Sequence, residues 1–264
     1  MNRLIYQVYV GKRSKLYDFC TESVKQYCDR FAIDHYVLKQ PKLRIKPDVF
    51  TTNRSVDSYQ KHGGFLPIYE KENAFDLIDQ YDQIAIVDAD IWVRPSTDQN
   101  IFDHFGTDHP FGAVCEREML CKPWYVDKLK NYSAMQYGQL HGKDGLDFKP
   151  TERGFEFFNM GMIMINSQLF APYLKNQTAK QFLDRTEFKR FIDGQGHWKW
   201  STDQTLLNYF LKKYSIPVKH LDDVWNGLYT ARHDIDQCNF VHFFLKDKLP
   251  NRGEDVEGLM KDVQ

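Results

Sequence analysis

The sequence predicts an α/β fold in which a mostly parallel central sheet is flanked by helices. Three observations support this prediction. Short apolar, β-rich runs alternate along the chain with segments whose apolar residues recur every three or four positions, as in amphipathic helices. The order strand, helix, strand implies right-handed crossovers and parallel pairing. The chain of 264 residues with 42% hydrophobic residues is long enough for one large domain with a sizeable core.

The N-terminal half carries the clearest signals. Residues 4–10 predict a strand that ends at Gly11, and the apolar positions from Leu16 to Cys28 have helical spacing. Further elements are a strand at 33–38, a loop at 40–57, a helix at 68–79 and a short buried strand at 84–87. Ligands of such sheets bind at the carboxyl ends of the strands, so the residues after Val87 are candidates for a site.

The C-terminal half predicts strands at 111–115 and 157–166, a helix at 203–213 and short strands at 216–220 and 239–244. Residues 116–150 are polar and aromatic with weak periodicity, and they predict no definite element. Residues 251–264 are polar and are expected to form a C-terminal tail that follows a single domain of residues 1–250.

Charge and cysteine content exclude several classes of protein. Lys and Arg number 35 and Asp and Glu 36, so no excess positive charge is available for nucleic acid. Five cysteines without a C-x-x-C pair favour neither a disulfide framework nor a zinc knuckle and suit a reducing compartment. Apolar runs fall far short of the ~20 residues of a membrane helix. With no signal-peptide pattern, these features predict a cytoplasmic protein without a transmembrane segment.

An acidic pair follows the strand at 84–87. Asp88 and Asp90 are close enough to repel each other, and a shared divalent cation would remove that cost. A D-x-D pair also caps helices, so its place at a strand end is what favours a metal site. Polar residues interrupt the later apolar runs at Asn159, Asp203, Gln204 and from His242 to Lys248.

At these positions the sequence resembles a known family. YDQIAIVDADIWVRP is similar to the strand and DxD segment of the GT-A glycosyltransferases. FFNMGMIMIN, STDQTLLNYF and VHFFLKDKLP resemble, in order and spacing, later blocks of GT8, the glycogenin and lipopolysaccharide galactosyltransferase family. The resemblance spans Leu4 to Pro250. It implies a GT-A fold with a small antiparallel addition and transfer of a hexose, glucose or galactose, from a UDP-sugar to an acceptor hydroxyl with retention.

The resemblance also implies a metal site. Asp88 and Asp90, with Ala89 between them, match the pair that binds Mn²⁺ or Mg²⁺ on the two phosphates of the donor. Carboxylate oxygens suit such hard cations. His242 matches the third ligand, although a lone His after an apolar strand is more often structural.

The resemblance assigns cations to the donor phosphates. Lys248 would neutralise the UDP leaving group. This chain has Leu245 where the family has Gly in that block, so the adjacent Lys246 is an alternative to Lys248. Lys71 matches a cationic position that contacts the donor, and its alternative is an exposed helix lysine.

The remaining blocks imply residues around the donor sugar. Asn159 and Gly161 match an N-x-G motif in which the amide faces the sugar and the glycine leaves room for it; a buried structural network is the alternative. Asp203 and Gln204 match a pair next to the reacting carbon, and the alternative for Asp203 is a helix N-cap.

The resemblance implies that the first strand frames the uridine through Tyr9, Val10 and Gly11. Trp198 and Trp200 offer flat faces for a sugar ring, with core packing as the alternative.

Two other functions fit parts of the sequence. A phosphatase of the haloacid dehalogenase type also has a D-x-D after a buried strand, but it has Thr or Val where this chain has Trp92. A non-catalytic protein that binds a sugar nucleotide or glycan fits the altered Lys248 block. For the enzyme, the acceptor is a glycan, a lipid-linked glycan or a protein.

Overall fold

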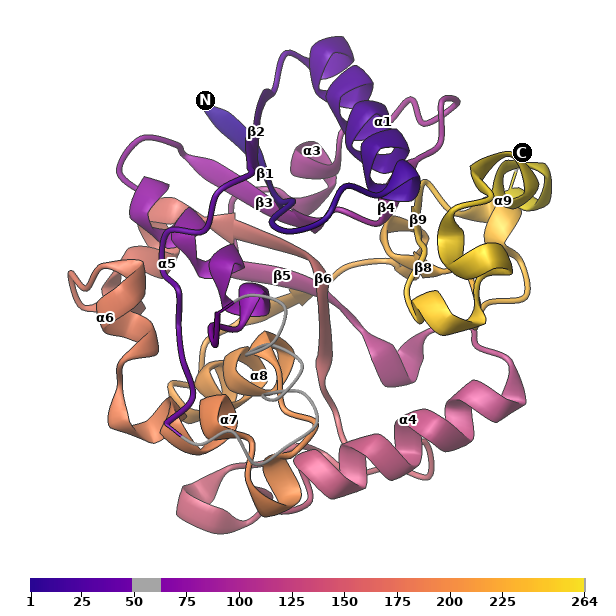
Figure 1. Ribbon diagram of the computed structural model, residues 1–264. Coiled ribbons are helices and arrows are strands. Elements are labelled where there is room, and N and C mark those ends of the chain that lie inside the picture. Colours follow the sequence, from indigo (N-terminus) through magenta and orange to yellow (C-terminus); the bar gives the residue numbers. More distant parts are fainter. Residues whose placement is uncertain (49–62, 264) are drawn as a thin grey trace.

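The computed structural model describes residues 1–48 and 63–263 and confirms the α/β class (Figure 1). Six strands form the central sheet in the order β2-β1-β3-β6-β5-β7. Their bounds are β1 Arg3–Val8, β2 Asp34–Leu38, β3 Gln83–Asp88, β5 Phe111–Cys115, β6 Phe158–Asn166 and β7 Val218–His220. Since β6 pairs antiparallel with β3 and β5 and the other pairs are parallel, five of these six described strands run in the same direction.

The reversed strand determines where polar residues meet. Val87 near the end of β3 pairs with Met162, and Cys115 at the end of β5 pairs with Phe158. The beginning of β6 therefore lies at the same edge of the sheet as the carboxyl ends of β3 and β5. Polar residues that follow those two strands meet the polar residues that open β6.

A second, small sheet has the order β4-β9-β8, with β4 Ile91–Val93, β8 Gly227–Leu228 and β9 Phe240–His242. β4 and β9 are antiparallel, and Ile91 pairs with His242. This pairing places His242 beside Asp90, which directly precedes β4. The predicted small second sheet is thus present, although it is mixed, because β8 pairs parallel with β9.

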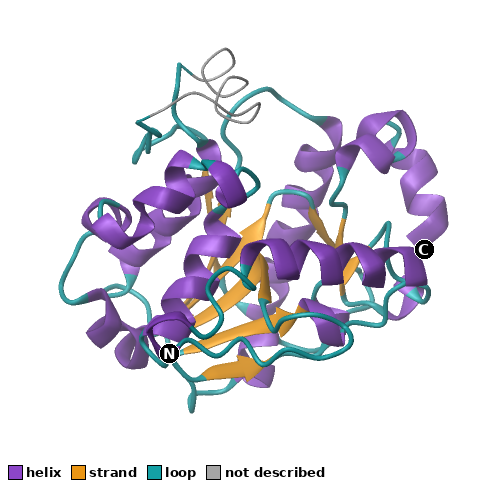
Figure 2. Cartoon of the chain, turned by 90° about the horizontal axis from the view of Figure 1, so that it is seen from below, coloured by secondary structure: helices purple, strands orange, loops and turns teal. Residues whose placement is uncertain are grey.

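Helices lie on both sides of the central strands (Figures 1 and 2). In Figure 1, α1 and α3 lie above β1 and β3, and α8 lies below. α1 buries one face, formed by Leu16, Cys20, Val24, Tyr27 and Cys28, as its spacing predicts. The helix bounds are α1 Lys15–Phe31, α3 Ile101–Phe105, α4 Pro123–Gln136, α5 Ser167–Leu174, α6 Ala179–Leu183, α7 Lys189–Asp193, α8 Asp203–Lys213 and α9 Val256–Val263.

Most predicted elements are found, with two differences in kind. The helix predicted at 68–79 is a 3₁₀ helix, η1 (Pro67–Leu77). The unassigned segment 116–150 contains α4. Residues 40–48 form the irregular segment expected there, and the rest of that predicted loop, 49–57, lies outside the described residues.

The C-terminal residues differ from the predicted polar tail. They form η9 (Pro250–Gly253) and α9, and Leu259, Met260 and Val263 are buried in an apolar cluster with Leu16 of α1. The physical reason is their helical spacing, which gathers the few apolar residues of a charged segment on one face.

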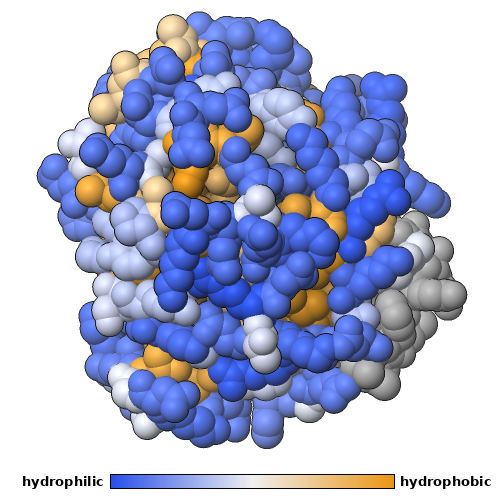
Figure 3. All heavy atoms as spheres, turned by 90° about the vertical axis from the view of Figure 1, so that its left-hand side faces the viewer, coloured by the Kyte–Doolittle hydropathy of each residue, from blue (hydrophilic) through white to orange (hydrophobic). Residues whose placement is uncertain are grey.

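One face of the molecule is mostly hydrophilic (Figure 3), and the cysteines are not paired with one another. On the face shown in Figure 3, hydrophobic side chains form small, separate patches among hydrophilic ones. All five cysteines are free thiols. No helix in the described part of the chain combines the length and the apolar character needed to cross a membrane.

Candidate active site

A cleft of about 490 Å³ opens at the edge of the central sheet where β3 and β5 end and β6 begins. Residues from both sheets, from α4 and from the start of α8 surround it. Its lining includes Lys71, Asp88, Asp90, Glu116, Tyr125, Lys128, Tyr132, Asn159, Gly161, Trp200, Asp203, Gln204 and His242. Most of the residues that the sequence analysis selected therefore lie around one cavity.

Three potential metal ligands meet in this cleft. His242 Nε2 lies 3.3 Å from Asp90 Oδ1 and 3.8 Å from Asp88 Oδ2, and one ligand atom from each residue lies within 4.8 Å of the others. Asp88 ends β3, His242 ends β9, and the pairing of Ile91 with His242 places Asp90, the residue before Ile91, beside His242. Ala89, between the two carboxylates, is buried and holds no polar group.

The electrostatics of the three residues favour a bound cation. Burial raises the pKa of Asp88 to about 6, against the opposing effect of Lys71. Burial alone would lower the pKa of His242, but the charges of Asp90 and Asp88 outweigh burial and raise it. The site thus holds two carboxylates in a desolvated place where positive charge is favoured.

A buried hydrogen-bond network orients His242. Its Nδ1 lies 3.0 Å from Asn226 Oδ1, while the Asn226 amide donates to Asn159 Oδ1 at 2.7 Å. The Asn159 amide in turn donates to Glu116 at 2.5 Å. Because Asn226 presents its oxygen to Nδ1, Nδ1 donates this hydrogen bond, and Nε2, which faces the two aspartates, is the nitrogen available to a cation.

The absence of a side chain at Gly161 leaves room for the His242 imidazole. A Cβ at this position would lie within 2.7 Å of His242 Nδ1 and 2.9 Å of Asn159 Oδ1, which is closer than real Cβ contacts. The Gly161 N–H also donates to Asn159 Oδ1 at 2.8 Å. Gly161 is therefore required by the packing of the network.

Lys71 connects the metal ligands with the start of α8. Its Nζ lies 2.6 Å from Asp88 Oδ1 and 3.0 Å from Asp203 Oδ2, and it donates to the Met160 carbonyl at 3.1 Å. Burial would lower the pKa of Lys71, but the two carboxylates raise it. Lys71 is a buried cation in the cleft, which excludes the alternative of an exposed helix lysine.

The structure also decides the N-cap question at α8. The N-cap is Thr202, whose side chain accepts from the Gln204 N–H. Asp203 is the first helical residue, is buried and points its carboxylate at Lys71. Gln204 Oε1 accepts from the Met160 N–H at 3.3 Å. Asp203 and Gln204 both line the cleft.

Sequence reasoning missed a group of residues from the segment 116–150. Glu116 is buried, and burial raises its pKa; Tyr125 donates to it at 3.3 Å. Lys128 and Tyr132 line the same side of the cleft. Glu116 directly follows the strand 111–115, so the rule that pointed to Asp88 was available for Glu116 as well.

Several predicted site residues lie outside the cleft within the described part of the chain. Tyr9 shares hydrogen bonds with Ser14, Val10 packs on the main core, and Gly11 is exposed with a φ of 118°. Lys246 lies 3.7 Å from Glu254. Lys248 stacks over the Trp124 ring at 3.6 Å.

The two tryptophans before α8 have different environments. Trp198 packs edge-on against Phe191, with Arg190 near its ring, and is partly buried against the main core. Trp200 is 52% exposed and lines the cleft. Of the two, Trp200 has a face available to a ligand.

The chain has the GT-A fold of the glycosyltransferases, as the sequence motifs predicted. It is similar to a glycosyltransferase involved in the glycosylation of the major capsid of PBCV-1, with a TM-score of 0.54 and 12% identity over 99% of this chain and 100% of that chain. It is also similar to the galactosyltransferase LgtC in complex with donor and acceptor sugar analogs, with a TM-score of 0.52 and 16% identity over 98% of this chain and 94% of that chain. No protein-family model and no curated protein sequence matches the chain.

Proposed function

We propose that the chain is a metal-dependent glycosyltransferase that transfers a hexose from a UDP-sugar to an acceptor hydroxyl with retention of configuration. The observation that carries the proposal is the convergence of Asp88, Asp90 and His242 beside Lys71 in one cleft. The GT-A fold supports it, as does the similarity to a galactosyltransferase bound to donor and acceptor sugar analogs.

The donor set fits Mn²⁺ or Mg²⁺. Two carboxylates and one imidazole whose Nε2 lone pair faces them are oxygen and nitrogen ligands of the kind such cations accept. A cation bound at this position would supply Lewis-acid stabilisation of the departing diphosphate. Asp88, Asp90 and His242 would hold it, and Asn226 keeps His242 in the ligating tautomer.

Cationic side chains would bind the rest of the diphosphate. Lys128 Nζ lies over the Tyr125 ring and Lys248 Nζ over the neighbouring Trp124 ring, and burial followed by the charge of Lys248 lowers the pKa of Lys128. A bound anion would relieve that repulsion. In this proposal Lys71, Lys128 and Lys248 stabilise the leaving group, and Lys246, which lies near Glu254, has a lesser part.

Transfer would break the bond between the anomeric carbon and the phosphate oxygen, while the acceptor oxygen bonds to that carbon from the same face and passes its proton to the departing phosphate oxygen. Asn159, Asp203 and Gln204 surround the space in which the sugar would sit. Their role is to position the sugar, and leaving-group stabilisation supplies much of the rate. The exposed ring of Trp200 offers a surface for a sugar at the mouth of the cleft.

Non-catalytic binding of a sugar nucleotide is the second candidate. It is favoured by one observation: Leu245, at the family's glycine position, has a left-handed backbone with a φ of 56°, and its side chain lines the cleft. A side chain there narrows the approach of the backbone to a phosphate.

The test begins with thermal denaturation in the presence of UDP, GDP, CMP or ADP, each with and without Mn²⁺. A nucleotide at about a hundredfold over its Kd adds roughly 2.7 kcal/mol of stability. Stabilisation by UDP that requires Mn²⁺ is expected, followed by UDP release from UDP-glucose or UDP-galactose.

The matched variants are Asp90→Asn and Asp98→Asn, an exposed aspartate in the same region of the chain. The first is expected to abolish the Mn²⁺-dependent shift and turnover, and the second to change neither. If UDP binds with Mn²⁺ but neither UDP-sugar releases UDP, even in the presence of glycan acceptors, the non-catalytic binding function would be favoured. No nucleotide response, with hydrolysis of p-nitrophenyl phosphate in Mg²⁺, would favour the phosphatase.

A further inference from the structure

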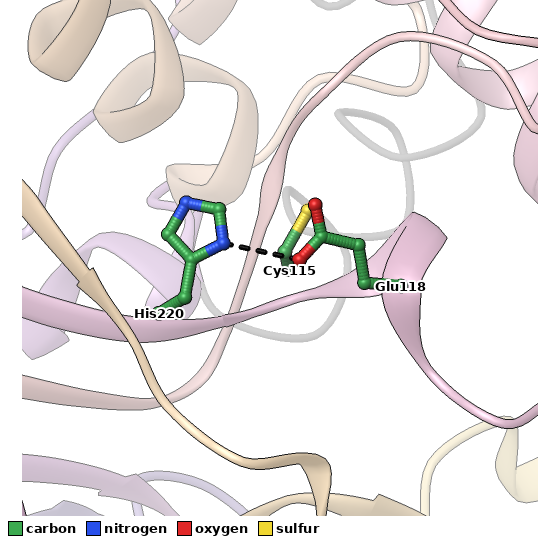
Figure 4. Close-up of side chains that lie close together, drawn as sticks. All are labelled: Cys115, Glu118 and His220. Carbon is green, nitrogen blue, oxygen red and sulfur yellow. Dashed lines mark hydrogen bonds and ion pairs between the residues drawn. The ribbon is translucent and has the colours of Figure 1, made fainter.

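A second group of potential metal ligands lies outside the cleft, where β5 meets the edge strand β7. It consists of Cys115, the last residue of β5, Glu118 in the 3₁₀ turn η2 (Glu116–Glu118), and His220, the last residue of β7 (Figure 4). The parallel pairing of β5 with β7 sets His220 opposite Ala113. The two strands therefore end side by side, and η2 brings Glu118 back over them.

We propose that Cys115, Glu118 and His220 bind a thiophilic divalent cation, with Zn²⁺ as the best match. One ligand atom from each residue lies within 4.8 Å of the others. With metal–ligand bonds of about 2.0–2.3 Å, the ligand atoms around a tetrahedral Zn²⁺ are roughly 3.3–3.8 Å apart. Small side-chain rotations bring the three atoms to that spacing.

The three side chains are arranged for entry of an ion from solvent. Cys115 is 2% exposed, whereas the His220 and Glu118 side chains are 41% and 51% exposed. His220 Nδ1 and Glu118 Oε2 lie 3.1 Å apart, and Cys115 lies next to them (Figure 4), with one ligand atom from each of the three residues within 4.8 Å of the others. The edge of the His220 ring is supported by Phe158, which limits its rotation.

The ligand chemistry separates this site from the one in the cleft. A thiolate, an imidazole and a carboxylate together select Zn²⁺ and similar metals, whereas the carboxylate-rich triad of the cleft suits Mn²⁺ or Mg²⁺. Three protein ligands leave a fourth position for water. The proposal does not depend on the proposed transferase activity.

A cation here would act on the shape of the cleft. η2 begins at Glu116, whose carboxylate accepts from Asn159 and Tyr125. Tying Glu118 to the ends of β5 and β7 fixes the turn that carries Glu116. The ion would therefore stabilise one wall of the cleft and would not enter the reaction.

The test is titration of the metal-free full-length chain with Co²⁺, which reports a thiolate ligand by a charge-transfer band in the near ultraviolet. One equivalent of Co²⁺ is expected to produce the band, and Zn²⁺ is expected to remove it by displacement. Asp90→Asn should keep the band, because the triad of the cleft holds no sulfur. Cys121→Ser, a partly buried cysteine outside the group, should keep it as well.

Cys115→Ser is expected to abolish the band, and His220→Gln to weaken Co²⁺ binding at least about tenfold. The second variant alters a side chain that is far more exposed than Cys115, so it tests the proposal even where Cys115→Ser folds poorly. Absence of the band in the unmodified protein, or a band of equal strength in His220→Gln, would overturn the proposal.

Discussion

Lys71 is the side chain whose removal has the most calculable effect. Its Nζ lies 2.6 Å from Asp88 and 3.0 Å from Asp203, and all three side chains are largely buried. Lys71→Met leaves two carboxylates without their cation. Breaking a buried ion pair from one side costs about 3–5 kcal/mol, which lowers the Tm of a chain of this size by about 6–20 °C.

The loss should depend on pH. Burial raises the folded pKa of Asp88 to about 6 even with Lys71 present, and removal of Lys71 raises it further. A carboxyl whose folded pKa exceeds its unfolded value of about 3.9 costs no stability at low pH and progressively more as pH rises through the folded value. The Tm deficit of Lys71→Met is therefore larger at pH 8 than at pH 5.

Differential scanning calorimetry at the two pH values measures this. Lys12→Met, at an exposed lysine, is the control and should leave Tm nearly unchanged. Adding Asp203→Asn to Lys71→Met should recover part of the loss, because one of the uncompensated charges is then removed. An equal deficit at pH 5 and pH 8 would refute this reasoning.

Three further changes have defined outcomes. Gly161→Ala places a Cβ against the His242 imidazole and should abolish Mn²⁺-dependent stabilisation by UDP while costing about 1–3 kcal/mol; an unchanged UDP response would contradict the packing argument. Asn226→Ala removes the acceptor of His242 Nδ1 and should weaken Mn²⁺ binding about 10–100-fold by calorimetric titration, so unaltered affinity would show that the tautomer is set otherwise. Burial raises the pKa of Glu72, and the charge of Asp203 raises it further. The unmodified protein therefore loses folding stability as pH rises above about 4.3, the pKa of an unfolded glutamate. Glu72→Gln should therefore raise Tm more at pH 8 than at pH 5, and a pH-independent change would argue against a buried carboxyl.

The sequence predicted the elements whose apolar pattern is local. The strand at 111–115 and the helix at 203–213 have the predicted bounds, since their patterns are complete within each segment. The direction of β6 was not predictable, because all nine of its residues are buried and a uniformly apolar run does not encode orientation. α4 was missed because its buried side includes the polar residues Ser133 and Gln136.

The candidate site shows the same division. Asp88 and Asp90 were selected because they follow an apolar run, and His242 because the resemblance implied a third ligand there; the structure brings the three together. No sequence pattern around Asn226 indicates a role for it, because that role depends on a hydrogen bond to His242 on another element. Tyr9, Val10 and Gly11 were expected near the donor from resemblance alone, and the described cleft does not include them.

The division of the cation ligands between two sheets has a consequence for local unfolding. Asp88 belongs to the central sheet, whereas His242 belongs to the small sheet, whose neighbouring residues Trp92 and Val241 share an apolar cluster with Leu259 of α9. Partial opening of the C-terminal region would separate His242 from Asp88 while the central sheet stays folded. A bound ion would then increase the hydrogen-exchange protection of the small sheet and α9, and opening of this region would weaken ion binding.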